Sequence, residues 1–343
     1  MGTGREQKRQ FSYLPVLSGT GTHSWIDYNG NGLEELNEFE VAAFKDQANY
    51  VKVFLPTNEF IYSYINEFNQ SFRIQAPLNW QSQSKFKRFV SRFNTITSYK
   101  ADRRLTDNDL RVILNPFQLN VADSTLITVN GLIKQTTFFN RSNSKFGIEH
   151  NIQTSRGKQF LNNGFEWRQQ DKQSVVNRIG ISKQFNLIVQ AEQSVKSNQS
   201  QFFENRNFRY TSQVFSPELF YQSSKGFRLG SFYKYTQALN DPLFSKDKAF
   251  IHEFGLEGRY FIVNRGNVDV KASRFNVNYL GNVSSPLGFD ILNGLNNGNN
   301  TTWSVSVGGK AKNNLQINVS YEGRQNQFGP IVHIGRAEAR YIF

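Results

Sequence analysis

The sequence has 343 residues, enough for one large β-barrel or two modest domains. It contains no cysteine, which excludes disulfides and thiolate metal sites. Its formal net charge of +13 makes nucleic acid a partner to consider. The basic residues are nevertheless spread along the chain and form no helix-turn-helix, zinc-finger or RNA-binding aromatic pattern, so we expect no nucleic-acid binding.

The distribution of apolar residues favours strands over membrane helices. The mean hydropathy is −0.55, and no run approaches the ~18 apolar residues that a membrane helix requires. Aromatic residues nevertheless make up 15% of the chain. This combination suits a transmembrane barrel, where only every second strand residue faces lipid. It also suits a soluble β protein, so composition leaves both classes open.

The N-terminus, MGTGREQKRQFSYLP, lacks the apolar segment of a signal peptide. Because a barrel must be exported, we expect Met1 to be an artificial start and the chain to be the C-terminal part of a longer precursor. A natural reading frame that begins at Met1 would count against an outer-membrane location.

The next stretch, WIDYNGNGLEELNEFEVAAF, contains the calcium-loop pattern D-x-[DN]-x-[DN]-G-x5-E without a gap. In such a loop, oxygens at the first, third and fifth positions surround one side of the ion, and a final glutamate closes the shell. Gly32 would make the sharp turn. The predicted Ca²⁺ ligands are Asp27, Asn29, Asn31, Leu33 through its carbonyl, Glu35 directly or through water, and Glu38.

The loop departs from the usual pattern in two ways. Position eight is Glu34 rather than an aliphatic residue, and only Asp27 and Glu38 are charged among the core ligands, which predicts modest affinity. The alternative interpretation is a polar Asn-Gly turn without an ion. We expect a short helix over residues 36–46 to follow, with an apolar side made by Phe39, Ala42, Ala43 and Phe44.

Strand patterns begin after this element and are interrupted once. Residues 50–55 predict a strand, residues 56–59 a turn, and residues 59–74 a long aromatic strand. Between residues 80 and 93 the apolar positions recur at three- and four-residue steps with Lys and Arg between them, which predicts a short basic amphipathic helix. It would lie on the membrane surface at the periplasmic side, or pack beneath the barrel mouth.

Alternation then predicts antiparallel strands over residues 93–102, 126–140, 145–156, 172–183, 187–196, 207–222, 227–238, 250–262, 267–279, 302–311, 315–324 and 331–343. Tight turns alternate with longer connections such as 157–171, an asymmetry typical of outer-membrane barrels. A change of phase at Ser273 and Arg274 predicts a β-bulge. We expect fourteen membrane strands if residues 50–55 and 59–74 join the wall, and twelve if they do not.

The last strand, IGRAEARYIF, shows two faces of different character. One face carries small and aromatic residues that end in Tyr341 and Phe343, whereas Arg336, Glu338 and Arg340 lie on the other. A barrel would place the first face in lipid and the second in a wet lumen. The terminal aromatic residue resembles the C-terminal signature by which the barrel-assembly machinery recognises bacterial outer-membrane barrels.

The charged residues predicted to point inward have both signs. They are Glu149, Arg178, Glu192, Arg228, Lys234, Glu253, Glu257, Arg259, Lys310, Glu322, Arg324, Arg336, Glu338 and Arg340. Two interpretations remain open: a structural lattice of ion pairs and water, or a conduit whose slight basic excess prefers anionic solutes.

The histidines indicate no catalytic site. His150, His252 and His333 fall in the lipid-facing phase, where a barrel lipase would place its site. None has a serine or acidic partner at a recognisable spacing, so we expect no enzymatic activity.

Several stretches together resemble the C-terminal parts of large, poorly characterised outer-membrane proteins of Bacteroidota. They are WIDYNGNGLEELNEFEVAAF, FLPTNEFI, the NGF after the strand that begins at Lys145, the hairpin WSVSVGGKAKNNLQINVSYEGR and the terminal aromatic residue. The resemblance implies an outer-membrane barrel preceded by a larger region, and it supplies no activity.

The sequence therefore predicts an all-β protein, a transmembrane antiparallel outer-membrane β-barrel over residues 58–343. A small periplasmic element with the calcium loop and helix would occupy residues 1–57. We expect an anchor or conduit of a larger envelope or secretion-associated protein in the cell outer membrane. Its partners would be outer-membrane lipid, the barrel-assembly machinery and other envelope proteins. The alternatives are a passive diffusion pore for small solutes and a secreted soluble β-sandwich adhesin.

Overall fold

The computed structural model describes residues 2–341 apart from 107–114, 116, 118–124, 162–163, 224–225, 263–265, 313–314 and 328. The terminal aromatic residue Phe343, which completes the predicted C-terminal signature, lies outside the described residues. The described chain forms a single antiparallel sheet of sixteen strands, in which β2 and β3 have only three residues each and the other fourteen are long. The prediction of an all-β antiparallel fold is confirmed. The long strands number fourteen, but they are not the fourteen predicted, because residues 50–55 and 59–74 form one strand and residues 2–15 form the additional one.

The strands are β1 (Gly2–Pro15), β2 (His23–Trp25), β3 (Phe39–Val41), β4 (Tyr50–Gln75), β5 (Phe93–Leu105), β6 (Leu126–Phe139), β7 (Phe146–Leu161), β8 (Gly164–Gly180), β9 (Phe185–Ser200), β10 (Phe208–Gln222), β11 (Phe227–Asn240), β12 (Lys248–Ile262), β13 (Gly266–Leu280), β14 (Gly298–Lys312), β15 (Leu315–Asn326) and β16 (Val332–Tyr341). The helical segments are η1 (Leu36–Glu38), η2 (Lys45–Gln47), η3 (Leu78–Ser82), α1 (Lys85–Val90), η5 (Glu204–Arg206) and α3 (Pro286–Leu292). Among the described residues, no helix has the length and apolar character needed to cross a membrane.

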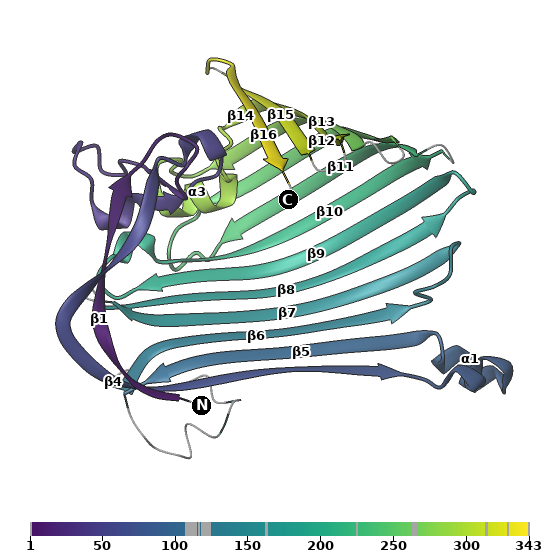
Figure 1. Ribbon diagram of the computed structural model, residues 1–343, viewed down its shortest axis with the longest axis horizontal. Helices are drawn as coiled ribbons and strands as arrows, with labels where there is room; N and C mark the ends of the chain where they lie inside the picture. Colours follow the sequence, from purple (N-terminus) through teal and green to yellow (C-terminus); the bar gives the residue numbers. More distant parts are fainter. Residues whose placement is uncertain are drawn as a thin grey trace.

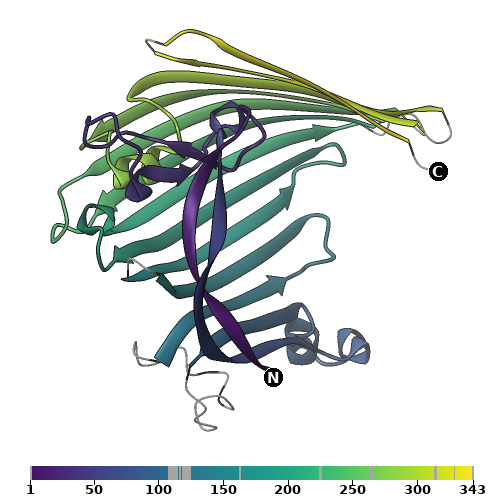
Figure 2. The same ribbon diagram turned by 60° about the vertical axis from the view of Figure 1, so that its left-hand side comes forward.

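The sheet curves into an open trough rather than a closed barrel (Figures 1 and 2). Strands β4 to β16 follow one another in chain order along the wall. Within the described part of the chain, β16 pairs only with β15, and no pairing joins it to β4 or β1. Barrel closure is therefore not a feature of this structure.

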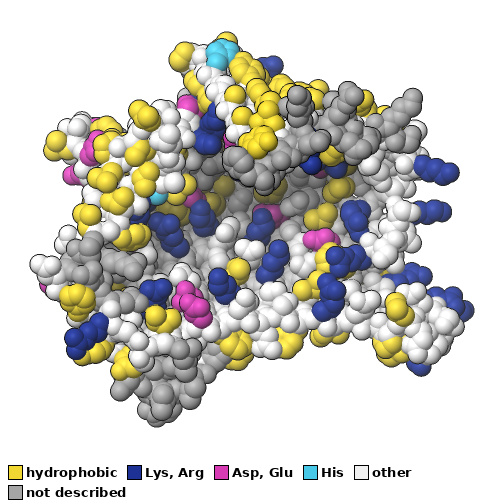
Figure 3. Space-filling view, in the orientation of Figure 1, with side chains coloured by type: hydrophobic (Ala, Val, Ile, Leu, Met, Phe, Trp, Pro, Cys, Tyr) yellow, Lys and Arg dark blue, Asp and Glu magenta, His cyan; other side chains and the backbone are white. Residues whose placement is uncertain are grey.

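The cross-strand register places the predicted inward charges on a single face. Directly paired residues share a face of a sheet, and Lys234 pairs with Glu253 while Glu322 pairs with Ser304. Following the pairs from β7 to β16 brings all fourteen predicted inward residues to one side. We call this side, which is concave, the inner face and the opposite side the outer face. Figure 3 shows Lys, Arg, Asp and Glu side chains across the hollowed inner face.

The two ends of the sheet differ in their connections. At one end only a few residues separate consecutive strands, for example residues 140–145 and 181–184. We call this the tight-turn end, and β4, α1 and β16 also meet it (Figure 1). The opposite end, the long-connection end, has segments such as 241–247 and 281–297. The predicted asymmetry is present, except that only residues 162 and 163 separate β7 from β8 there.

Several predicted boundaries are wrong. Residues 50–55 and 59–74 form one continuous strand, β4, of 26 residues, and the expected domain boundary at residue 57 falls inside it. The basic opening, where no strand was expected, forms β1, which pairs with the first half of β4. The connection expected over residues 157–171 is instead the extended end of the β7–β8 hairpin. Register in β13 is continuous, so the bulge expected at Ser273 and Arg274 is absent from this strand.

The prediction of a helix over residues 36–46 is also wrong. Two 3-10 turns, η1 and η2, flank the short strand β3, which pairs with β2. Phe39 is buried because its ring stacks on Tyr13 with centroids 4.1 Å apart and contacts Tyr50 edge-on. This packing requires an extended backbone and overrides the local helical preference. The basic helix is present but shorter, as η3 and α1, and its Phe86 and Phe89 are exposed.

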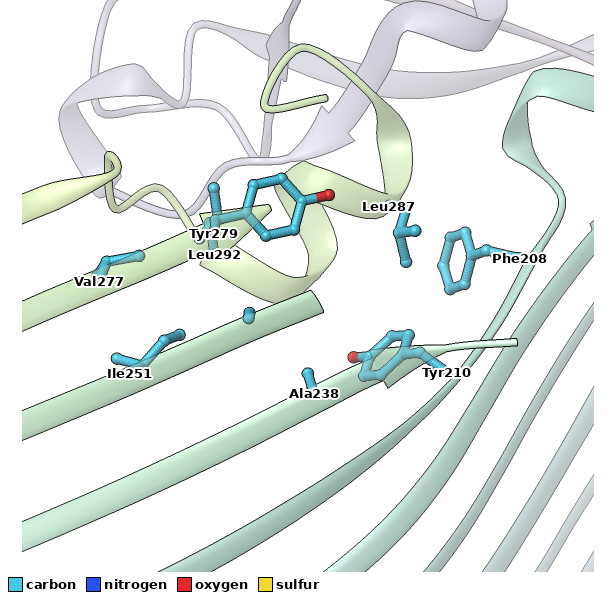
Figure 4. Close-up of a cluster of buried hydrophobic side chains, with 9 residues drawn as sticks. Phe208, Tyr210, Ala238, Ile251, Val277, Tyr279, Leu287 and Leu292 are labelled. Atoms are coloured by element: carbon cyan, nitrogen blue, oxygen red, sulfur yellow. The ribbon is translucent and has the colours of Figure 1, made fainter. Parts of the chain in front are cut away.

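The main apolar core forms where α3 lies on the inner face (Figure 4). Leu287 and Leu292 of α3 pack on Tyr210, Ile251 and Tyr279 of the strands below. The sequence defines this short helix because Ser285 caps it by accepting a hydrogen bond from the Gly288 amide, and Pro286 supplies a fixed first turn. Burying each such leucine contributes ~1.5–3 kcal/mol, which fixes the 281–297 connection over the trough.

Candidate functional site

The outer face carries a band of exposed apolar side chains that starts at the tight-turn end. Phe254 and Leu256 of β12 are each 61% exposed, an unusual state for large apolar residues on a soluble protein. The band crosses β7 to β16 and includes Phe146, Ile179, Phe185, Leu219, Phe227, Leu229, Tyr260, Val270, Val307, Ile317, Val319 and Tyr341. We call it the outer apolar band.

Amphipathic rings mark the edge of this band that is farther from the tight turns. The Tyr233 hydroxyl and His252 Nδ1 share a hydrogen bond of 2.8 Å, and Tyr321 and His333 share another of 2.8 Å. Trp303 Nε1 donates to the Tyr321 hydroxyl at 3.4 Å. Tyrosine and tryptophan concentrate where an apolar phase meets water. The predicted outward phase of His150, His252 and His333 is confirmed by the register.

Beyond these rings the outer face becomes polar. On β7 and β8, Arg156 and Asp171 form a bidentate ion pair with both N–O distances at 3.0 Å, and Gln169 donates to the same carboxylate. β7 has 16 residues and β8 has 17, whereas ~9–11 tilted residues cross a bilayer. The strands are therefore long enough for an apolar segment followed by a water-exposed segment.

On β4 to β6 the outer face carries polar and apolar side chains together: Phe72 and Ile74 of β4 pair with Thr97 and Thr95 of β5 and are 54% and 74% exposed. Thr97 and Gln135 pair there directly, and Thr95 pairs with Thr137. Phe117 also stacks on Tyr99 of this face with ring centroids 5.2 Å apart. Exposed apolar side chains therefore continue across this part of the wall, with threonine and glutamine side chains between them.

The inner face holds charged groups of both signs, several of them paired. Lys172 Nζ lies 2.8 Å from Glu192, and Arg259 pairs with Asp269. A pocket of about 350 Å³ opens between β11 and β14 and is lined by Arg228, Glu257, Arg259, Asp269 and Lys271, with Ser304 and Ser306. The arrangement contains elements of both predicted interpretations, a lattice of ion pairs and a polar passage.

One end of the inner face is covered by residues 16–49, which we call the cap. The Arg206 guanidinium, at the end of η5, donates to the Asn37 carbonyl and contacts Glu40, both at 2.9 Å. Asp46 accepts two hydrogen bonds from Arg324 of β15. These contacts hold the cap at the long-connection end, beside α3 (Figures 1 and 2). The sequence-based expectation placed this element at the periplasmic end, where tight turns are found.

The cap contacts alter the protonation equilibria of their carboxyl groups. Burial raises the pKa of Glu40, and the positive charge of Arg206 offsets only part of this effect. Hydrogen bonds from Arg324 lower the pKa of Asp46 despite partial desolvation. Burial and the nearby Glu40 carboxylate raise the pKa of Tyr28, whose hydroxyl donates to Glu40 at 3.3 Å.

The predicted calcium loop lies on the exposed side of the cap and is organised by its own side chains. Asp27 accepts hydrogen bonds from the amides of Gly30 and Gly32 at 2.7 and 2.9 Å. Asn29 and Asn31 accept from amides two residues ahead, at 2.9 and 2.7 Å. The chain reverses at Gly30 and Gly32, where φ values of +73° and +72° favour glycine.

Glu38 brings the end of this loop back to its beginning. It is fully buried, and its carboxylate accepts from Trp25 Nε1 at 2.9 Å and from the Tyr28 amide at 3.2 Å. Glu35 accepts from the Asn29 side-chain amide at 2.8 Å. Asp27, Asn29, Asn31, Glu35 and Glu38 therefore belong to one closed loop, whereas the Leu33 side chain is exposed. Oxygen donors of these kinds suit Ca²⁺, although their N–H contacts occupy part of the acceptor capacity.

No metal cluster of three or more His, Asp or Glu side chains occurs among the residues that the structure describes. The contacts that sequence reasoning missed are those between the cap and the wall. They join Glu40 to Arg206 and Asp46 to Arg324 across long sequence separations, for which no local pattern exists.

No family model and no curated protein matches the sequence. Among solved structures, CdiB from Acinetobacter baumannii is similar with a TM-score of 0.42 and 9% sequence identity. The match covers 98% of this chain and 60% of that structure, so the chain spans about three fifths of its length. This likeness is too slight to indicate a function.

Proposed function

We propose that the protein is an integral β-barrel protein of the bacterial outer membrane, an anchor or conduit of a larger envelope or secretion-associated protein. The outer apolar band carries this proposal, because Phe254, Leu256 and their neighbours are exposed to solvent unless lipid covers them. The tyrosine, histidine and tryptophan side chains at its edge suit the interface between hydrocarbon and water. A soluble β-sandwich adhesin would bury such a surface against a second sheet.

The difference between the two ends of the sheet supports an orientation of the chain in the membrane. Short turns face the periplasm in outer-membrane barrels, which places α1 and the end of β16 on the periplasmic side. The cap and α3 are then on the extracellular side. This orientation supports contact between the basic residues of α1, including Lys87 and Arg88, and the anionic surface of the inner leaflet.

The open edges of the sheet support a role within a longer polypeptide. Among the described strands, β16 pairs only with β15, and the segment Asn66–Gln75 of β4 pairs only with β5. Unpaired backbone groups are costly in hydrocarbon. We propose that the rest of a longer precursor completes the wall, as the resemblance to Bacteroidota outer-membrane proteins implies. The barrel-assembly machinery and other envelope proteins are its proposed partners, and it has no catalytic activity of its own.

A passive diffusion pore is the second candidate, favoured by the charged inner face and its pocket near Arg259. Planar-bilayer recordings on the purified chain, and on the precursor that contains it, separate the two. An anchor whose long-connection end is covered by the cap should give no steady conductance. Steady open channels with a preference for anions would support the pore, and a protein that stays in the aqueous phase without detergent would contradict both.

We also propose that the loop of residues 27–38 binds one Ca²⁺ ion with modest affinity. Asp27, Asn29, Asn31, Glu35 and Glu38, with the Leu33 carbonyl, would hold the ion, which would cross-link the two ends of the loop. The closure of the loop through the contact between Glu38 and the Tyr28 amide supports this proposal.

A further inference from the structure

One cation lies within the outer apolar band. Arg274 is on the outer face of β13, directly paired with Phe254 of β12 and Thr301 of β14, and its side chain is exposed. Because the register of β13 is continuous, no bulge turns this side chain to the inner face. The other outward residues of β13 nearest to it are Ala272 and Asn276, which carry no charge.

The outer face offers Arg274 no carboxylate. The acidic residues on β10, β12 and β13 are Glu218, Glu253, Glu257 and Asp269, and the register places all of them on the inner face. No ion pair of Arg274 is found within the described part of the chain. The guanidinium therefore lacks the protein counter-ion that the inner-face arginines Arg259 and Arg324 have.

A shallow apolar groove of about 610 Å³ leads to Arg274 along the outer face. Its sides are formed by large residues, among them Leu219, Tyr233, Phe254 and Leu256. Small side chains, Ser231 and Ala272, leave space between them. The groove thus has an apolar length and one charged end, close to the ring of Tyr233 that marks the edge of the band.

A guanidinium at the edge of a hydrocarbon phase needs an anion or water. Arginine reaches the interface by extending its apolar stem along the surface, and its planar fork matches phosphate oxygens in two parallel hydrogen bonds. An acyl chain in the apolar groove removes apolar surface of both the lipid and the protein from water, which is favourable. The charge and the groove therefore complement a phosphate-bearing lipid.

We propose that Arg274 and this groove bind one membrane lipid, with the lipid phosphate on the guanidinium and an acyl chain along Leu256 and Leu219. The proposal rests on the function proposed above, since the outer face must meet a bilayer. It goes beyond general lipid contact because it names one site and one headgroup chemistry.

The test compares lipid retention by the purified full chain and three variants. The proteins are reconstituted into phosphatidylcholine nanodiscs in which about one lipid in five is phosphatidylglycerol, extracted with mild detergent and analysed by native mass spectrometry. Both phospholipids are counted, because both carry the phosphate. Arg274→Gln should lower the retained phospholipid by about fivefold or more, and Arg274→Lys should retain most of it. Arg209→Gln, an exposed cation on the outer face beyond the band, should change nothing.

Three results would overturn the site. Unchanged retention by Arg274→Gln would show that the charge is not used, and an equal loss in Arg209→Gln would indicate non-specific attraction. Displacement of the lipid by millimolar inorganic phosphate would show that the site takes a free anion rather than a lipid. If instead no variant enters the nanodiscs, the membrane function itself fails, which distinguishes the two proposals.

Discussion

The Arg324 guanidinium in β15 binds the Asp46 carboxylate in the cap through two parallel hydrogen bonds, across a sequence separation of 278 residues. The side chains are 10% and 23% exposed, and the Phe44 ring covers the guanidinium at 4.2 Å. A bidentate, largely desolvated pair is among the stronger polar contacts of a protein. It links the first fifty residues to the penultimate strand.

Replacing Asp46 by Ala should release the cap. It leaves Arg324 unpaired, at a cost on the order of 2 kcal/mol, less than the ~3–5 kcal/mol of a fully buried pair. Hydrogen exchange of residues 36–49 should therefore quicken, while exchange in β8 stays unchanged. Arg340→Ala is the matched control, because its pair with Glu338 has side chains 70% and 64% exposed and contributes little. Equal exchange in both variants would contradict the anchoring role.

A charge placed in the outer apolar band should disrupt membrane insertion. Val307→Arg introduces a cation on the outer face, with an expected cost of ~2–4 kcal/mol near the bilayer midplane. Ser306→Arg adds the same side chain one residue earlier, on the inner face, and should be tolerated. Folding yield into phospholipid vesicles, read from resistance to protease, measures the difference. Equal yields would show that the outer face does not meet lipid.

Calcium binding should depend on the charge of Asp27. Asp27→Asn preserves the size of the side chain but removes one negative charge and one of the two acceptor oxygens, so the Kd for Ca²⁺ should rise by about tenfold or more, equivalent to at least ~1.4 kcal/mol. Glu34→Gln removes one charge at a position that is no ligand, where the side chain accepts from the Tyr50 hydroxyl. Isothermal titration calorimetry on both variants is the measurement. Absence of heat in the unmodified protein would identify the loop as a turn without an ion.

Acidification should first strengthen and then weaken the cap. Burial raises the pKa of Glu40 above its ordinary value of 4.5, so its stabilising contribution is complete below that value and is lost as the pH rises through the raised pKa. The pKa of Asp46 is below its ordinary value of 3.8, so its contribution is present above 3.8 and is lost only as the pH falls through the lowered pKa.

Cap protection, measured by hydrogen exchange with correction for intrinsic rates, should therefore increase as the pH falls from 7 towards 4.5, the ordinary pKa of the Glu40 carboxyl group. Below about pH 3.8 it should decrease as Asp46 is protonated. Glu40→Gln should remove the first effect and leave the second. A protection profile that is flat between pH 7 and 4.5 in the unmodified protein would contradict this assignment of the Glu40 carboxyl group.

The alternation of apolar and polar residues predicted the two faces of the wall correctly, because successive side chains of a strand point to opposite faces. Arg336, Glu338 and Arg340 were assigned to one face from the sequence, and the register confirms it. The position of the cap could not be predicted in this way. Its contacts depend on Arg206 and Arg324, which no neighbouring pattern connects to residues 40 and 46.

Two errors have a common physical cause. The helix expected near Phe39 is absent because stacking on Tyr13 and pairing with Trp25 hold that segment extended. The turn expected at residues 56–59 is absent because β1 pairs along β4 on both sides of these residues. In both cases β1, where no strand was expected, supplies the partner. An open wall likewise cannot be distinguished from a closed barrel by alternation, since both have the same two faces.

β4 takes part in two strand pairings. Its first half forms a two-stranded ribbon with β1, and its second half, Asn66–Gln75, pairs with β5 in the wall (Figure 2). Antiparallel hydrogen bonds lie perpendicular to the strands. A force applied along β1 at Gly2 would thus strain many of these bonds together rather than break them one after another. The ribbon of β1 and β4 is therefore suited to carry tension, and a pull on Gly2 would be transmitted directly to the wall strand beside β5.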